Sequence, residues 1–222
     1  MTLGERGLVG RMAEPVELAF GATLLAPGGR IEHVVFPDDG LVSLMAELPG
    51  GARAEVGVVG REGLVGLPAL LGAPHTPFRA VVQVPGRGQR VGVGALLLLA
   101  DGSRNLRDLV RRYAMASLVH ASFAALCNAA HPLERRAARW LLGVQDRVGA
   151  GFPITQEYLA VMLGSRRPTV NAALRGLKAA GLVRHVRGRV AVADRAGLEA
   201  AACPCYRAER AELERLLPNA FG

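Results

Sequence analysis

Two arginines, Arg166 and Arg167, stand directly before a proline in the stretch GSRRPTVNAAL, residues 164–174. Thr169 and Asn171 follow within the first turn if this stretch is helical. Arginine can donate two parallel hydrogen bonds to guanine, and asparagine can pair in the same way with adenine. Backbone amides at the start of a helix also attract phosphate. These residue types at this spacing therefore indicate contacts with nucleic acid.

The surrounding residues predict a helix-turn-helix. Thr155 is a suitable N-cap for a first helix over residues 156–163, and Gly164 allows the positive φ needed between two crossed helices. Pro168 suits the start of the second helix because no amide hydrogen is needed there, and Gly181 ends that helix. The apolar contacts between the two helices are expected from Leu159, Leu163, Val170, Leu174 and Leu177.

A hairpin is expected over residues 182–192, LVRHVRGRVAV, with its turn at Gly188. A hairpin after the second helix makes the unit a winged helix-turn-helix, which presents the N-terminal end of its second helix to base edges in the major groove. Arg187 and Arg189 flank the tip of the wing, where they are suited to backbone phosphates.

Positive charge is concentrated in the same region. Residues 1–130 hold 12 Lys/Arg against 11 Asp/Glu, whereas residues 131–222 hold 15 against 8. Within residues 164–195 there are eight basic residues and one acidic residue, Asp194. Such an excess favours a polyanionic partner, although a solvated basic face would have the same composition.

The first hundred residues predict short β-strands separated by Gly/Pro turns, a pattern typical of a sandwich or barrel-like roll. The predicted strands are residues 16–25, 29–36, 40–48, 52–60 and 78–84. Residues 60–78 interrupt this pattern, and we expect a single helical turn and an irregular loop there.

A long helix is expected over residues 104–131, which contain neither glycine nor proline. One stripe has coiled-coil-like spacing and predicts either a parallel dimer seam or a helix packed on its own domain. The stripe consists of Leu106, Val110, Tyr113, Ser117, His120, Ala124 and Cys127.

The sequence contains no motif typical of a membrane protein, a secreted protein or an enzyme. The longest apolar run, residues 95–100, is too short to span a bilayer, and residues 1–17 lack the apolar segment of a signal peptide. We therefore expect a soluble cytoplasmic protein without a membrane partner. No nucleophile–base pair, HExxH motif or phosphate-binding loop indicates an enzyme.

Together these motifs resemble the cyclic-AMP receptor protein/Fnr (Crp/Fnr) family, most specifically in residues 154–174 and 36–67. The resemblance implies an α+β fold in three parts: a cyclic-nucleotide-binding-type β-roll (1–101), a long dimerisation helix (102–130) and a winged helix-turn-helix DNA-binding domain (131–222). It implies a homodimeric transcription regulator on a two-fold-symmetric DNA operator, with RNA polymerase as a further partner. The alternative is a small-molecule or cyclic-nucleotide binding module whose DNA binding is secondary.

The family's recognition helix is matched only in part. Arg167 matches its first arginine, but Pro168 replaces the usual glutamate and Ala172 replaces a guanine-reading arginine. The operator should therefore differ from the family's usual one, with Asn171 as a replacement contact. The expected DNA-binding residues are Arg166, Arg167, Thr169, Asn171, Arg175, Arg187 and Arg189.

Family members that bind cyclic nucleotides hold the ribose with a glutamate and the phosphate with an arginine and a hydroxyl residue. At the matching positions this chain has Leu67 after Gly66, and Ala80 after Arg79, so we do not expect cyclic AMP to be its effector. Any effector pocket should lie between the roll and the long helix, at Gly66, Leu67, Arg79, Ala80, Ala121 and Ser122.

No metal or cofactor is expected. The chain lacks the N-terminal cysteines of the family's iron–sulfur members, and its three cysteines imply no disulfide framework. His75 or His120 could offer a haem ligand, but each is expected to be an ordinary histidine. Cys203 and Cys205, one residue apart, lack two further ligands nearby in the sequence, so a solvent-side tail is expected there. Cys127 is expected to pack as a small apolar residue.

Overall fold

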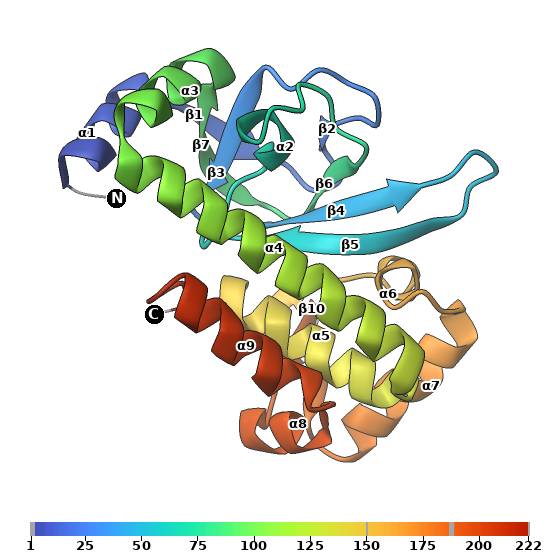
Figure 1. Cartoon of the computed structure of the whole chain (residues 1–222). Helices are drawn as coiled ribbons and strands as arrows, with labels where there is room; N and C mark the ends of the chain where they lie inside the picture. Colours follow the sequence, from blue (N-terminus) through green and yellow to red (C-terminus); the bar gives the residue numbers. More distant parts are fainter. Residues whose placement is uncertain (1–2, 150, 187–188, 222) are drawn as a thin grey trace.

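The computed structural model describes residues 3–149, 151–186 and 189–221. A short helix, α1 (Leu3–Met12), precedes a β-roll, a long helix crosses the molecule, and the C-terminal helices gather beneath the roll (Figure 1). This is the α+β arrangement that the sequence predicts.

Two antiparallel sheets form the roll. One sheet has the order β1-β7-β3 and the other β2-β6-β4-β5. The strands are β1 (Glu14–Leu18), β2 (Thr23–Leu25), β3 (His33–Pro37), β4 (Leu41–Glu47), β5 (Arg53–Val59), β6 (Arg79–Val84) and β7 (Gly86–Gly92). Apolar side chains from both sheets fill the interior, including Leu18, Val35, Val42, Val59, Ala80 and Val82.

Strand β7 was not predicted, because its sequence, GRGQRVG, has the composition of a turn. It nevertheless pairs with both β1 and β3. A Cβ atom at Gly88 would lie 2.6 Å from the carbonyl oxygen of Phe36, and one at Gly86 would lie 2.6 Å from that of Asp39. The glycines are therefore required by close backbone approach inside the sheet. The predicted single helical turn is present as α2 (Leu67–Leu70).

Helix α3 (Val93–Gly102) leads into α4 (Arg104–Ala130), whose first turn is capped by the Ser103 side chain accepting from Leu106 N. One face of α4 is buried within the chain; for example, the Tyr113 hydroxyl donates to Leu64 O at 3.2 Å. The buried residues of α4 are Leu106, Val110, Tyr113, Ala116 and Cys127.

Most side chains of the predicted stripe contact this chain, so of the two expected alternatives the structure shows a helix packed on its own chain at these residues. The large apolar residues that α4 leaves exposed are Met115, Leu118 and Leu126, at 46%, 58% and 51%. An 18-residue window of α4 has mean hydropathy 1.2, so by length and composition alone this helix could also cross a membrane.

The C-terminal part is mostly helical, with a small third sheet of order β8-β10-β9. Its elements are α5 (Leu133–Val148), β8 (Gly151–Pro153), α6 (Gln156–Met162), α7 (Arg167–Ala179), β9 (Val183–Val186), β10 (Arg189–Val192), α8 (Arg195–Ala201) and α9 (Cys205–Leu216). Helix α9 runs beside α4 (Figure 1).

The two cysteines at the start of α9 do not lie in a solvent-side tail. Cys203 and Cys205 are 2% and 3% exposed, and they pack with Cys127 near the end of α4. The expectation for these two residues was wrong because the sequence does not reveal that the chain returns along α4. Cys127 is buried, as predicted.

Candidate nucleic-acid interface

Helices α6 and α7 form the predicted helix-turn-helix. Tyr158 N donates to the Thr155 hydroxyl at 3.1 Å, so Thr155 caps α6 as expected. Gly164 has φ 54° in the turn, a left-handed conformation that favours glycine. The predicted apolar residues are all buried where the two helices pack: Leu159, Leu163, Val170, Leu174 and Leu177.

Helix α5 fixes the orientation of this unit. It packs against α7, and the Arg136 guanidinium donates to Leu163 O at the end of α6. That hydrogen bond satisfies a carbonyl that has no partner within its own helix. The turn between α6 and α7 is thereby held on the rigid surface of α5.

The start of α7 projects basic side chains into solvent. Arg166 occupies its N-cap position, Arg167 is its first residue, and both are exposed, as is Thr169. Asn171 differs, because it is half-buried and its Oδ1 atom has no hydrogen-bond partner within the described protein. Arg175 is exposed one turn further along α7. The first turn of α7 therefore offers two guanidinium groups and a hydroxyl for outside contacts.

The wing consists of β9 and β10, which pair from Arg189 with Val186 to Val192 with Val183. Arg189 is exposed and donates to Gly151 O at 2.6 Å. The predicted turn at Gly188 and the predicted phosphate contact Arg187 lie outside the described residues.

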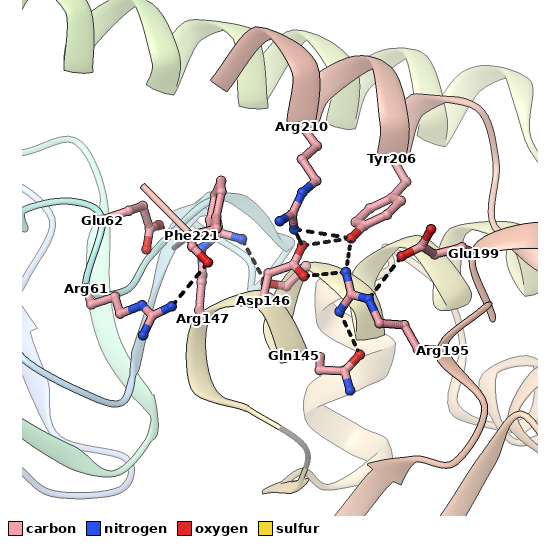
Figure 2. Close-up of polar contacts among 11 residues, drawn as sticks. Arg61, Glu62, Gln145, Asp146, Arg147, Arg195, Glu199, Tyr206, Arg210 and Phe221 are labelled. Atoms are coloured by element: carbon pink, nitrogen blue, oxygen red, sulfur yellow. Dashed lines mark hydrogen bonds and ion pairs between the residues drawn. The ribbon is translucent and has the colours of Figure 1, made fainter. Parts of the chain in front are cut away.

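Arg195, one of the eight basic residues counted above, is used inside the protein. Its guanidinium lies 2.7 Å from Asp146 and 3.0 Å from Glu199. Arg210 and the Tyr206 hydroxyl also converge on the Asp146 carboxylate (Figure 2). The surplus charge available to a partner is therefore concentrated on α7 and the wing.

Polar contacts dock the C-terminal part onto the roll. Trp140 Nε1 donates to Glu55 Oε1 at 2.8 Å, and Arg147 Nε lies 2.7 Å from Glu62 Oε1. Burial raises the pKa of the Glu55 carboxyl, although hydrogen bonds from Ser43 and Trp140 oppose this shift. Sequence reasoning missed these pairs, because no local pattern joins residues 85 positions apart.

The structure does not gather the predicted effector residues around one pocket. Arg79 forms an ion pair with Glu47 at 3.0 Å and lines a cavity bordered by Tyr158 of α6. Its neighbour Ala80 points the other way, into the core of the roll. Of the remaining candidates, Gly66 precedes α2 with φ 106°, Leu67 begins α2, Ala121 is half-buried, and Ser122 is exposed and donates to Leu118 O.

The helices and wing define the class of protein as one with a winged helix-turn-helix domain. Residues 135–201 match the family model described as a Crp-like helix-turn-helix domain. No curated protein sequence matches the chain significantly.

Solved structures extend this similarity to the whole fold. FixK2 from Bradyrhizobium japonicum has TM-score 0.75 at 18% identity, covering 86% of this chain and 98% of its own. TTHB099, a CRP-family transcriptional regulator from Thermus thermophilus, has TM-score 0.70 at 21% identity, covering 85% and 96%. The c-di-GMP responsive global regulator CLP from Xanthomonas campestris has TM-score 0.69 at 17% identity, covering 86% and 99%. The chain carries a Crp-like helix-turn-helix domain within the fold of the Crp/Fnr regulators, and the resemblance predicted from the sequence is confirmed.

Proposed function

We propose that this protein is a transcription regulator that binds double-stranded DNA as a homodimer at a two-fold-symmetric operator. The observation that carries the proposal is the exposed, arginine-rich start of α7, held by α5 and α6 in a helix-turn-helix. In this class of domain the same end of the second helix enters the major groove. A regulatory function of this kind calls for no catalytic group, and it places the protein in the compartment that holds the DNA.

The roles of the DNA-binding residues follow from their positions. Arg166, Arg167 and Thr169 would reach base edges from the first turn of α7, where Arg167 is suited to guanine. Arg175 and Arg189 are exposed further from this turn and would contact backbone phosphates. Asn171 could reach a base only by turning its half-buried amide outward.

Dimerisation would use the outer face of α4. Met115, Leu118 and Leu126 are exposed on one long helix, and their spacing of three and eight residues places them on one face of it. A second copy of α4 would cover them and place two recognition helices on successive half-sites. Once bound at a promoter, such a dimer could contact RNA polymerase.

Any effector would differ from cyclic AMP. Arg79 is paired with Glu47, and Ala80 belongs to the apolar core, so neither side chain is free to hold a cyclic phosphate inside the roll. The alternative function, a small-molecule binding module, would place its ligand in the Arg79 cavity beside α6.

Selection of bound sequences from random double-stranded DNA tests the proposed function. We expect enrichment of an inverted repeat whose half-sites lie about one helical turn, or 10–10.5 base pairs, apart. A variant with both Arg166 and Arg167 changed to alanine is the control, and it should enrich no such repeat. Recovery of unrelated sequences by the unaltered protein would contradict the proposal.

A further inference from the structure

Three segments of the chain meet where α4 ends. Cys127 lies in the last turn of α4, and His131 follows that helix at its junction with α5. Cys203 lies between α8 and α9, and Cys205 is the first residue of α9. Each of the four side chains offers one ligand atom, and all four atoms lie within 4.8 Å of one another.

The spacing along the chain suits a shared site. Cys127 and His131 are four residues apart, and His131 N donates to Cys127 O at 3.1 Å, so both side chains project from the same end of α4. Two ligands four residues apart are a recurring spacing in zinc sites. Cys203 and Cys205 supply a second pair from the loop that begins α9.

The distances also suit a tetrahedral ion. Zinc binds thiolate at about 2.3 Å and imidazole at about 2.0–2.1 Å, which places tetrahedral ligand atoms about 3.5–3.8 Å apart. Cys127 Sγ lies 3.3 Å from Cys203 Sγ, and Cys205 Sγ lies 3.6 Å from His131 Nδ1. Small rotations of the side chains would complete the geometry.

We propose that Cys127, His131, Cys203 and Cys205 bind one divalent cation. The ion is one that prefers thiolate ligands and tetrahedral geometry, such as Zn²⁺. Four protein ligands leave no open position on such an ion, so the site is structural and not catalytic. An iron–sulfur cluster fits less well, because the ligands of its different iron atoms must stand further apart.

The electrostatic surroundings match the charge of the filled site. Three thiolates and one Zn²⁺ leave a net charge of −1. Arg139 interacts favourably with Cys127 and Cys203, and Arg136 interacts favourably with Cys127. These guanidinium groups would offset the remaining negative charge in a place that is otherwise packed against Phe123.

The site joins three parts of the chain: the end of α4, the junction with α5 and the start of α9. His131 stands at the joint between α4 and α5, and the two cysteines of the loop begin the helix that runs beside α4. A bound ion would therefore fix α9 and the start of the helix-turn-helix domain to the end of α4. The existence of the site does not depend on the proposed function, whereas an effect of the ion on DNA binding would.

The test uses the full chain purified under reducing conditions. After treatment with a chelator and its removal, the protein is titrated with Co²⁺, which reports tetrahedral thiolate coordination by intense visible bands and sulfur-to-metal charge transfer. We expect one Co²⁺ per chain, displaced stoichiometrically by Zn²⁺. Cys203→Ser should weaken the sulfur-to-metal charge transfer and lower the affinity, and His131→Ala should shift the visible bands and lower the affinity, whereas His75→Ala, which removes an exposed histidine elsewhere, should change neither.

Thermal unfolding shows whether each variant is folded and whether Zn²⁺ stabilises it. Zn²⁺ should raise the Tm of the unaltered metal-free protein and of His75→Ala, but not that of Cys203→Ser or Cys205→Ser. Three outcomes would overturn the proposal: weak octahedral Co²⁺ bands, equal binding by the cysteine variants, or isolated protein that contains iron and sulfide instead of a single ion. A Cys127–Cys203 disulfide that persists in protein purified under reducing conditions would be a fourth.

Discussion

Arg147 Nε of α5 lies 2.7 Å from Glu62 Oε1 of the roll, and the two side chains are 6% and 5% exposed. The guanidinium also lies over the ring of Phe221, 5.2 Å from its centroid. The pair thus joins the roll, the helix-turn-helix domain and the C-terminal end of the chain. Removing one member would leave an uncompensated charge in a buried place.

We expect Arg147→Met or Glu62→Gln to lower the free energy of unfolding by about 3–5 kcal/mol, because a broken buried ion pair leaves an unpaired partner. The double variant Arg147→Met/Glu62→Leu should recover part of this loss. Glu14→Gln is a matched control: it breaks the exposed Arg90–Glu14 pair and should cost about 1 kcal/mol or less. Urea unfolding compares the four variants with the unaltered protein, and equal midpoints for Glu62→Gln and Glu14→Gln would contradict the assigned role.

Acid stability should depend on Glu209, which lies 2.5 Å from both His120 Nδ1 and an Arg139 nitrogen. Burial opposes ionisation of this carboxyl, but His120 and Arg139 outweigh burial and lower its pKa to about 2. Its ordinary pKa is 4.5, so the unfolded chain binds the proton more readily as the pH falls. Stability from Glu209 is therefore fully present above pH 4.5 and is lost as the pH falls toward 2.

The loss should amount to about 3 kcal/mol at most. Unfolding midpoints measured from pH 6 to pH 3 should fall in the unaltered protein, and they should fall less in Glu209→Gln, which has no carboxyl to protonate. Equal slopes for the two proteins over this range would show that other groups govern acid unfolding.

The outer face of α4 should form the dimer interface. Leu118→Glu places two like charges near each other across such an interface and should weaken dimerisation by about 2 kcal/mol or more. Leu71→Glu, at a leucine 54% exposed in the roll, is the control and should leave the dimer intact. Sedimentation equilibrium gives the dissociation constants. A monomer at all concentrations would contradict dimerisation, and a dimer indifferent to Leu118→Glu would place the contact elsewhere.

Cyclic AMP should neither bind tightly nor raise DNA affinity. Relative to family members that bind it, Leu67 and Ala80 remove two hydrogen-bonding side chains, each worth about 1.5–3 kcal/mol to a charged group. Together these losses correspond to about a hundredfold to ten-thousandfold weaker binding. Calorimetry with cyclic AMP and cyclic GMP provides the measurement. Low-micromolar binding with enhanced operator affinity would show that the loop makes contacts we have not assigned.

The helix-turn-helix could be predicted closely because its signals are local. The Thr155 cap, the positive φ of Gly164 and the buried leucines depend on residues a few positions apart. The orientation of α4 could not be predicted, because apolar residues such as Tyr113 and Leu118 occupy both faces and periodicity alone does not say which face meets the roll.

Contacts between residues far apart in the sequence could not be predicted either. The cysteine cluster joins Cys127 to a loop 76 residues later, and only the return of α9 along α4 brings the two together. The predicted effector pocket failed for a different reason, because the directions of the side chains on strand β6 were not taken into account. Arg79 and Ala80 are adjacent in sequence, but neighbours on a strand point to opposite faces, so they cannot share one pocket.

The most direct test of the account is the DNA affinity of Arg167→Ala, measured by fluorescence anisotropy on the selected operator and on random DNA at several salt concentrations. We expect operator affinity to fall by about 1–3 kcal/mol while affinity for random DNA changes little, because a base-reading side chain acts only on its own sequence. Arg189→Ala, at the exposed wing, should weaken both DNAs alike and reduce the salt dependence. An equal loss on both DNAs for Arg167→Ala would contradict the claim that the start of α7 reads the operator.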